Sequence, residues 1–371
     1  MVAIVRKKHA PGRRIRNQSS AAIIGLVCGI AAFLILSAHE SRAETIQQAL
    51  AAAFAGNPGL DAERLRQKAD EEFVRQAWGK FLPAISLEAE KGKEDSRTTP
   101  GTSQRTKPEG YGVTLTQPLF RGFRTYNGTR KAKAEVQAGQ FQLSDREQEV
   151  LLDTITAYAD VLRDRRILEL RQSNISYLET ELKASTARFR AGDLTRTDVA
   201  QARARLHEGK ADLVEAEADL AASSARYEAV IGHAPGGLAP AAVPVTLIPA
   251  SLAEAYAAAD ADNPEIGGAR QQAEAANRAK LQAYGALMPD LSLELSQTKS
   301  FGDLGSVDHE DESAVFLRLN MPLFAGDRRS KIRQSAAQES RRNLEILDSR
   351  RRIRAAVTDA WQHSLADRER I

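Results

Sequence analysis

The sequence predicts a mainly α-helical protein with a small β part, in which long antiparallel coiled-coil hairpins are joined to four strands per subunit. Three observations predict this fold class. Apolar residues recur at every seventh position through the middle of the chain, four short segments alternate apolar and polar residues, and one unit of sequence occurs twice. Aromatic residues make up only 5% of the 371 residues, which favours long helices packed through small side chains over a compact enzyme.

The N-terminal segment 1–43 has the pattern of a secretory signal peptide. Six basic residues precede an apolar run from Ala21 to Ala38, and Ser41 and Ala43 are the small residues that a signal peptidase reads. We expect cleavage after Ala43; the alternative is an uncleaved membrane anchor, because the run is nearly long enough to span a bilayer. Removing this segment takes away seven basic residues and one acidic residue, which changes the formal net charge from +3 to −3. The basic leader therefore gives no indication that the protein binds nucleic acid.

Several motifs of the first half recur 204 to 206 positions later, which indicates an internal duplication. They are Asn57-Pro58, which recurs as Asn263-Pro264, Ser86-Leu87-Glu88, which recurs as Ser292-Leu293-Glu294, and Pro118-Leu119-Phe120, which recurs as Pro322-Leu323-Phe324. The chain then divides into the signal peptide (1–43), a first repeat (44–235), a Pro/Gly/Ala-rich linker (236–250) and a second repeat (251–371). We expect the second repeat to be incomplete, because the helical arm that follows in the first copy would lie beyond Ile371.

Each repeat predicts the same order of elements. A helix follows the Asn-Pro and runs to the residue before Pro83 or Pro289, where proline breaks it. Two strand-like runs come next, separated by polar loops, 91–109 and 298–313, that we expect to face outside the cell. A very long helix starts after the Pro-Leu-Phe-x-Gly.

The strand-like runs alternate apolar and polar residues, so each strand has one apolar and one polar face. This pattern suits a membrane β-barrel with its apolar face toward lipid. The alternative is a soluble antiparallel sheet lying on a helix. Export and the recurrence of Glu88 as Glu294 favour the barrel. The polar positions expected to line its lumen are Ser86, Glu88, Thr114, Thr116, Ser292, Glu294, Arg318 and Asn320.

Four strands cannot close a barrel, and an open sheet edge cannot face lipid. Three subunits would supply twelve strands, which lies within the range of bacterial outer-membrane barrels. We therefore expect a homotrimer with cyclic symmetry, surrounded by outer-membrane lipid.

Two runs of residues at seven-residue spacing predict a coiled-coil hairpin. The first run is Val161, Leu168, Ile175, Leu182 and Phe189, and the second is Val199, Leu206, Leu213, Leu220 and Tyr227. Three positions after each residue of the second run lie Ala202, Gly209, Ala216, Ser223 and Val230. Mostly small residues at these positions permit a close approach of the two helices.

The chain reverses between the two runs. Gly192 can adopt the left-handed conformation that ends a helix, and Thr195 with Asp198 forms a capping box for the next one. The two arms are therefore antiparallel. The helix from about Thr125 to Arg190 would be on the order of 100 Å long.

The segment from Arg188 to Val199, the duplicated Asn-Pro segments and the Pro-Leu-Phe-x-Gly junctions resemble the TolC-like outer-membrane efflux and type I secretion proteins. The resemblance implies a trimer with a twelve-stranded outer-membrane barrel and a periplasmic α-helical barrel. It also implies two partners, a periplasmic adaptor (membrane fusion) protein and an inner-membrane pump of the ABC or RND type. The adaptor contact that it indicates is the hairpin tip, at Gly192, Asp193, Leu194, Thr195 and Asp198.

No enzyme motif accompanies these features. The histidines outside the leader are scattered without metal-ligand spacing, and no Gly-rich phosphate loop or nucleophile motif is visible. The one cysteine, Cys28, lies in the leader, which argues against disulfides and thiolate chemistry. We therefore expect no catalysis, cofactor or metal.

The function that this sequence predicts is a passive exit duct for drugs or unfolded protein, located in the bacterial outer membrane and extending into the periplasm. The alternatives are an exported coiled-coil scaffold without channel activity and the periplasmic adaptor itself. The duplicated strand pairs argue against the adaptor, which should have lipoyl-like β segments flanking one hairpin.

Overall fold

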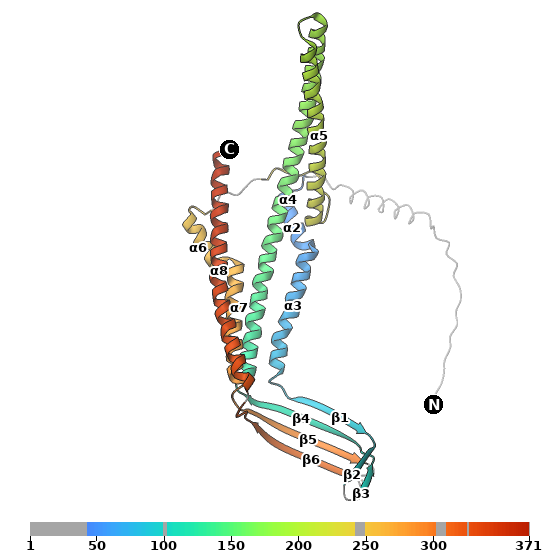
Figure 1. Cartoon of the computed structure of the whole chain (residues 1–371), viewed down its shortest axis with the longest axis vertical. Helices are drawn as coiled ribbons and strands as arrows, with labels where there is room; N and C mark the ends of the chain where they lie inside the picture. The colour runs from blue at the N-terminus through green and yellow to red at the C-terminus, as the bar shows by residue number, and fades with distance from the viewer. Residues whose placement is uncertain (1–42, 99–101, 242–248, 302–308, 325, 371) are drawn as a thin grey trace, which may run out of the picture.

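The computed structural model describes residues 43–98, 102–241, 249–301, 309–324 and 326–370. The predicted signal peptide, except Ala43, and much of the predicted linker therefore lie outside the described residues. The described chain is an elongated body of helices with an antiparallel sheet at one end and a helical hairpin at the other (Figure 1).

Each repeat begins with a short helix followed by a longer one. These helices are α2 (Ile46–Gly56), α3 (Pro58–Gly79), α6 (Leu252–Asp262) and α7 (Pro264–Gly285). The side chain of Asn57 caps α3 by accepting hydrogen bonds from the backbone N–H groups of Gly59 and Leu60, and Asn263 caps α7 in the same way. The two Asn-Pro motifs are thus the start signals of matching 22-residue helices.

Helices α3 and α7 end earlier than predicted. Helix α3 was expected to continue to Leu82 but ends at Gly79, and a turn follows in which the N–H of Phe81 donates to the carbonyl of Trp78. Proline disfavours the helical conformation of the residue before it, so the chain leaves the helix ahead of Pro83.

The main sheet has the strand order β1-β4-β5-β6, with all neighbours antiparallel. Its strands are β1 (Ala84–Lys91), β4 (Glu109–Arg121), β5 (Asp290–Phe301) and β6 (His309–Asn320). The prediction that both polar segments between the strands are loops is partly wrong. The polar segment 91–109 contains a further hairpin, β2 (Glu94–Thr98) and β3 (Thr102–Thr106), and much of 298–313 belongs to β5 and β6.

A tight turn connects the sheet to the long helices. Gly122 and Phe123 both have a positive φ, of 57° and 59°, and helix α4 (Arg124–Ala191) then runs for 68 residues. Helix α5 (Arg196–Ile231) returns antiparallel to it and forms the long hairpin. The expected hairpin is therefore present with nearly the predicted bounds.

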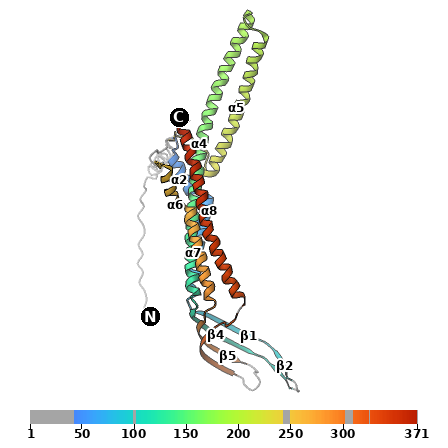
Figure 2. The same ribbon diagram turned by 60° about the vertical axis from the view of Figure 1, so that its left-hand side comes forward.

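Figures 1 and 2 show helices α3, α4, α7 and α8 (Gly326–Arg370) side by side between the sheet and the hairpin. A hydrophobic core lies where α2 meets α4 and α5. Its buried members are Ala49, Ala53, Val150, Ala157, Tyr158, Val161, Tyr227 and Ile231. Within the described ranges, none of the helices combines the length and the apolar composition that crossing a bilayer requires.

Candidate functional site

One face of the main sheet is apolar and exposed. Ile85 and Leu87 on β1 are 70% and 71% exposed, and Val315, Leu317 and Leu319 on β6 are 65% to 69% exposed. The register places Val113, Leu115, Leu293 and Leu295 of the central strands on the same face. A contiguous apolar surface of this kind needs an apolar partner.

Aromatic side chains occur near both ends of this apolar face. Ring contacts join Tyr111 to Phe301 at 6.0 Å, Trp78 to Phe81 at 5.4 Å and Phe120 to Phe123 at 5.3 Å. On β5 the apolar stretch of this face runs from Leu291 to Leu295, and Gln297 and Lys299 lie between it and Phe301. Apolar side chains flanked by aromatic ones are typical of the wall of an outer-membrane barrel.

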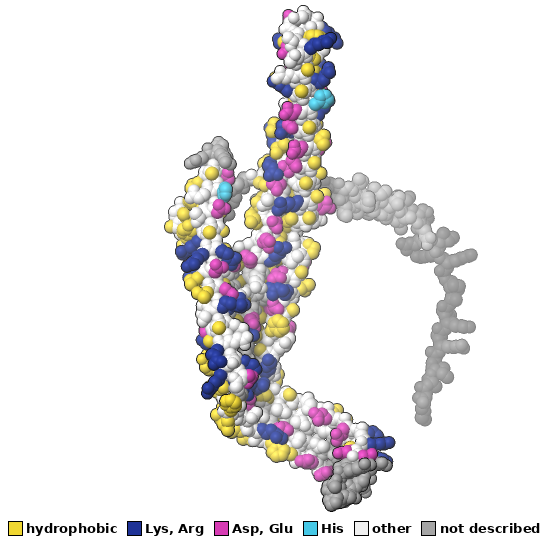
Figure 3. Space-filling view, in the orientation of Figure 1, with side chains coloured by type: hydrophobic (Ala, Val, Ile, Leu, Met, Phe, Trp, Pro, Cys, Tyr) yellow, Lys and Arg dark blue, Asp and Glu magenta, His cyan; other side chains and the backbone are white. Residues whose placement is uncertain are grey.

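The opposite face of the sheet brings together all eight side chains predicted to line a lumen. The pairs on this face include Ser86 opposite Thr114, Thr116 opposite Glu294 and Ser292 opposite Arg318. Figure 3 shows the sheet from this side, on which neutral polar and acidic side chains predominate. The polar face can therefore contact water along its whole length, and its role as a lumen wall stays a prediction.

Acidic side chains outnumber basic ones on the polar face. The glutamates are Glu88, Glu90, Glu294, Glu310 and Glu312. Arg318 forms an ion pair with Glu294, with 2.5 Å between Nε and Oε2, and its guanidinium lies 5.0 Å from the ring centre of Phe316. The negative charge is thus offset near Arg318 and remains in excess toward the end of the sheet that carries the connecting loops.

The tip of the hairpin is a tight, exposed reversal. Gly192 has a φ of 89°, and the N–H of Asp193 donates to the carbonyl of Arg188 at 3.0 Å. The hydroxyl and N–H of Thr195 both donate to Asp198 Oδ2 at 2.8 Å, and the N–H of Asp198 donates back to the Thr195 hydroxyl. These bonds hold the pKa of Asp198 below its usual value. The predicted capping box is confirmed, whereas the adaptor contact stays a prediction.

Sequence reasoning missed a polar cluster in the core around Glu44. The hydroxyl of Tyr227 donates to Glu44 Oε2 at 2.8 Å, and His233 Nε2 lies 3.4 Å from Glu44 Oε1. The hydroxyl of Tyr158 lies 2.7 Å from the carbonyl oxygen of Glu44 and 2.6 Å from that of Ala239. Burial and the Glu44 carboxylate raise the pKa of Tyr227 far above its ordinary value. The cluster ties the segment just before α2 to α4, to α5 and to the segment after α5.

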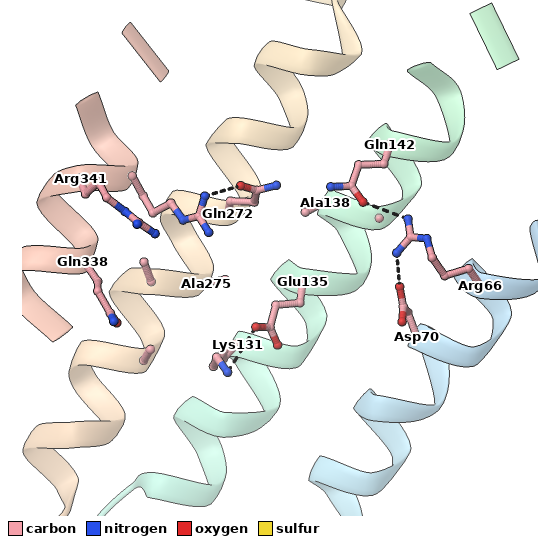
Figure 4. Close-up of a pocket in the computed structure, with 14 residues that line it drawn as sticks. Arg66, Asp70, Lys131, Glu135, Ala138, Gln142, Gln272, Ala275, Gln338 and Arg341 are labelled. Carbon is pink, nitrogen blue, oxygen red and sulfur yellow. Dashed lines mark hydrogen bonds and ion pairs between the residues drawn. The ribbon is translucent and has the colours of Figure 1, made fainter. Parts of the chain in front are cut away.

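A charged groove of about 380 Å³ lies between α3, α4, α7 and α8 (Figure 4). Arg66 bonds to Asp70 at 2.8 Å and to Gln142 at 2.9 Å. On α4 Lys131 pairs with Glu135 at 3.2 Å, and on α8 Arg342 bonds to Gln272 at 2.9 Å and pairs with Glu345 at 2.7 Å. These basic side chains of the groove's wall thus have local partners, and Arg66, Lys131 and Arg342 each pair with a carboxylate. Among the described residues, no group of three or more His, Cys, Asp or Glu side chains could hold a metal ion.

An exposed apolar sheet face, a polar face behind it and a 68-residue helix define a mainly helical protein whose small sheet is suited to a membrane. The profile of the family described as outer membrane efflux protein matches residues 46–233. The efflux protein BepC of Brucella suis biovar 1 (strain 1330) is 32% identical over 342 residues, which make up 91% of this chain and 73% of BepC. The chain therefore belongs to the outer membrane efflux protein family, whose place is the bacterial outer membrane.

Two further relatives agree with this assignment. The alkaline protease secretion protein AprF of Pseudomonas aeruginosa is 24% identical over 356 residues, 92% of this chain and 74% of AprF. The solved structure of the outer membrane protein VceC of Vibrio cholerae matches with a TM-score of 0.74 at 17% identity, covering 88% of this chain and 80% of VceC. The predicted TolC-like family, the predicted fold class and the prediction of a channel protein instead of an enzyme are confirmed.

Proposed function

We propose that three copies of this chain join their sheets into a twelve-stranded barrel in the outer membrane and their helices into a periplasmic tunnel. The polar sheet face lines the lumen, and the apolar face contacts lipid. The assembly is a passive exit duct, and its energy comes from a pump in the inner membrane.

One observation carries this proposal: the main sheet has two unlike faces and two open edges. Among the described strands, β1 and β6 each have a neighbour on one side only. An open edge exposes unpaired backbone N–H and C=O groups, which hydrocarbon does not tolerate. Symmetric closure with further copies satisfies these groups and places the exposed leucines of the apolar face in lipid.

The tip of the α4–α5 hairpin is the proposed contact with a periplasmic adaptor. Its exposed Asp193 and Thr195 stand at the end of the hairpin farthest from the sheet. A rigid rod that presents a capped tight turn reaches a partner deep in the periplasm with little loss of conformational entropy. The matching pump is of the ABC or RND type, and the relatives named for efflux and for protease secretion support drugs or unfolded protein as cargo.

Conductance measures the proposed function directly. The full chain is extracted from separated outer membranes in mild detergent and added to planar lipid bilayers. The duct predicts discrete conductance steps from material with the mass of a trimer. An outer-membrane protein that yields no steps, with or without adaptor, would instead support the envelope scaffold.

A complementation experiment addresses the partners. Cells lacking this chain are expected to accumulate a fluorescent drug or to retain a secreted protein, and the intact chain restores export. Asp193→Lys is expected to reduce export and adaptor binding. Glu208→Lys, on the exposed shaft of the same hairpin, is the matched control and should leave both unchanged.

A further inference from the structure

A second pocket, of about 550 Å³, lies where α3 and α4 meet the main sheet. Its wall carries four basic side chains, Lys80, Arg121, Arg124 and Lys131, and one acidic side chain, Glu135. The volume lies in the range of pockets that hold small organic molecules. The pocket therefore combines room for a ligand with an excess of positive charge.

Two of the four cations have carboxylate partners and two do not. Lys131 pairs with Glu135 at 3.2 Å (Figure 4), and Arg124 forms an ion pair with the first residue of β5. Lys80 and Arg121 are exposed, and within the described part of the chain no ion pair involves either of them. Two positive charges of this pocket are thus available to an anion.

The internal duplication shows that the fold does not require the side chains that distinguish this pocket. They are Lys80, Arg121 and Phe73, whose ring belongs to the wall and is 51% exposed. The second repeat builds the same order of helices and strands with alanine in all three places. The equivalent residues, at the repeat offsets, are Ala286, Ala325 and Ala279. Packing of the repeat therefore does not account for the two cations and the ring.

The strand register places the pocket on the side of the polar sheet face. Arg121 lies opposite Asp290, which in turn lies opposite Asn320 of the predicted lumen wall. At the same junction Phe123 contacts Phe120, which the register places on the apolar face. The basic side chains thus continue the polar face at the level where the sheet ends and the helices begin.

The lining fits an organic anion better than a simple inorganic one. A guanidinium such as that of Arg121 can donate two parallel N–H groups to a carboxylate, and the ammonium of Lys80 adds a point charge. The exposed ring of Phe73 offers an apolar surface to the rest of the molecule. An inorganic ion would use the two cations and leave this ring without a contact.

We infer that this pocket binds organic anions in which a carboxylate is joined to an aromatic or apolar body. Lys80 and Arg121 hold the carboxylate, and Phe73 contacts the body. This inference rests on the proposed duct and names a class of cargo that the wall of the duct favours. Because Lys80 and Arg121 are exposed to solvent, the binding is weak enough for the cargo to move on.

Equilibrium dialysis with 1-naphthoate, an aromatic carboxylate, measures this site. The full chain is used in mild detergent, and detergent alone is the blank for uptake by micelles. Lys80→Ala with Arg121→Ala is expected to weaken binding at least about tenfold, because two charge-assisted bonds are lost. Phe73→Ala is expected to weaken it about threefold through the lost ring contact. The neutral alcohol 1-naphthalenemethanol should bind no better to the intact chain than to the double variant.

Two further double variants complete the binding experiment. Lys68→Ala with Lys133→Ala removes two exposed positive charges from α3 and α4 outside the pocket, and it should leave 1-naphthoate binding unchanged. Lys80→Gln with Arg121→Gln removes the charges but keeps long polar side chains. It should lose as much binding as the alanine variant, so a folding defect confined to the alanine variant would not decide the result.

Block of the conductance tests whether the pocket lies in the path of cargo. Addition of 1-naphthoate to channels in planar bilayers is expected to reduce their conductance. Lys80→Ala with Arg121→Ala should raise the half-blocking concentration at least about tenfold, whereas Lys68→Ala with Lys133→Ala should leave it unchanged.

The outcomes separate the pocket from the duct. Equal binding of 1-naphthoate to the intact chain and to both pocket variants overturns the pocket, and conductance steps that persist leave the duct standing. Specific binding of the neutral alcohol as tight as that of 1-naphthoate overturns the role of the two cations. Binding that depends on Lys80 and Arg121 in a protein without conductance steps overturns the duct and, with it, the assignment of the anion as cargo.

Discussion

Thr195 and Asp198 satisfy each other's backbone N–H groups at the start of α5. The first N–H groups of any helix have no partner within the helix, so they bond to a capping side chain or to water. The capping box therefore sets both where α5 begins and how sharply the hairpin turns.

Thr195→Ala removes the hydroxyl of this cap. We expect it to destabilise the first turn of α5 by about 1 kcal/mol, the usual effect of losing an N-cap. Hydrogen exchange of residues 193–200, followed by mass spectrometry, should show reduced protection there. Thr197→Ala, an exposed threonine in the same turn, is the control and should leave protection unchanged.

The stability of the tip should also depend on pH. The pKa of Asp198 lies below the value of 3.8 expected for an unperturbed aspartate, because the carboxylate accepts the N–H and hydroxyl of Thr195. A lowered pKa means that the stabilising contribution is present above pH 3.8 and is lost as the pH falls below it. Protection factors at the tip, corrected for intrinsic exchange, should fall in that range. Asp198→Asn should abolish this dependence, and a dependence that survives in it would contradict the assignment.

Helices α4 and α5 pack through small side chains. Ala202, Gly209, Ala216 and Ser223 are all buried on the face of α5 that meets α4. A Cβ on Gly209 would lie 2.8 Å from Leu178 Cδ1, so the two helices approach closely there. Close contact along a long hairpin makes a stiff rod, because neither helix can bend without losing its neighbour.

Ala216→Leu tests this seam. The larger side chain has no space against α4 and should destabilise the hairpin by about 1–3 kcal/mol. The matched control is Ala218→Leu, which makes the same change at an exposed position of the same helix. Loss of hydrogen-exchange protection in α5 is expected for the buried substitution alone. Equal effects of both substitutions would contradict the close packing of α5 against α4 at Ala216.

Short-period patterns made the elements predictable from the sequence. The seven-residue spacing located Ala216 and Gly209 in the helix seam, and the two-residue spacing located Leu293 and Glu294 on opposite sheet faces. Both patterns report local geometry, which the chain repeats many times.

Features that depend on distant partners were not predictable. Tyr227 donates to Glu44 across 183 positions, and no pattern in the sequence connects the two. The sequences of β2 and β3 contain no apolar residue, so they lack the alternation that revealed β1 and β4. Its existence depends on strand pairing, which a single sequence does not display.

In the assembled barrel, the apolar and the polar face of one strand should tolerate an introduced charge differently. Leu295 lies on the apolar face of β5, and the adjacent Ser296 lies on the polar face. Leu295→Arg is expected to cost about 2–4 kcal/mol near the bilayer midplane, because the charge faces hydrocarbon. Ser296→Arg puts the same charge in the lumen and should be tolerated. Recovery of each variant from outer membranes measures the difference, and equal recovery would contradict the assignment of the two faces.

The open edges and the exposed Leu323 and Phe324 also bear on how the cell handles a newly exported subunit. A lone copy displays bare strand edges and solvated leucines, which are the features that promote aggregation. Such a copy should be bound by periplasmic chaperones and degraded by proteases. Its half-life should be short unless it assembles with other copies. Because a ring needs several encounters, the number of finished ducts should rise more steeply than in proportion to the rate of synthesis. Quality control of the unassembled subunit would then set the export capacity of the cell.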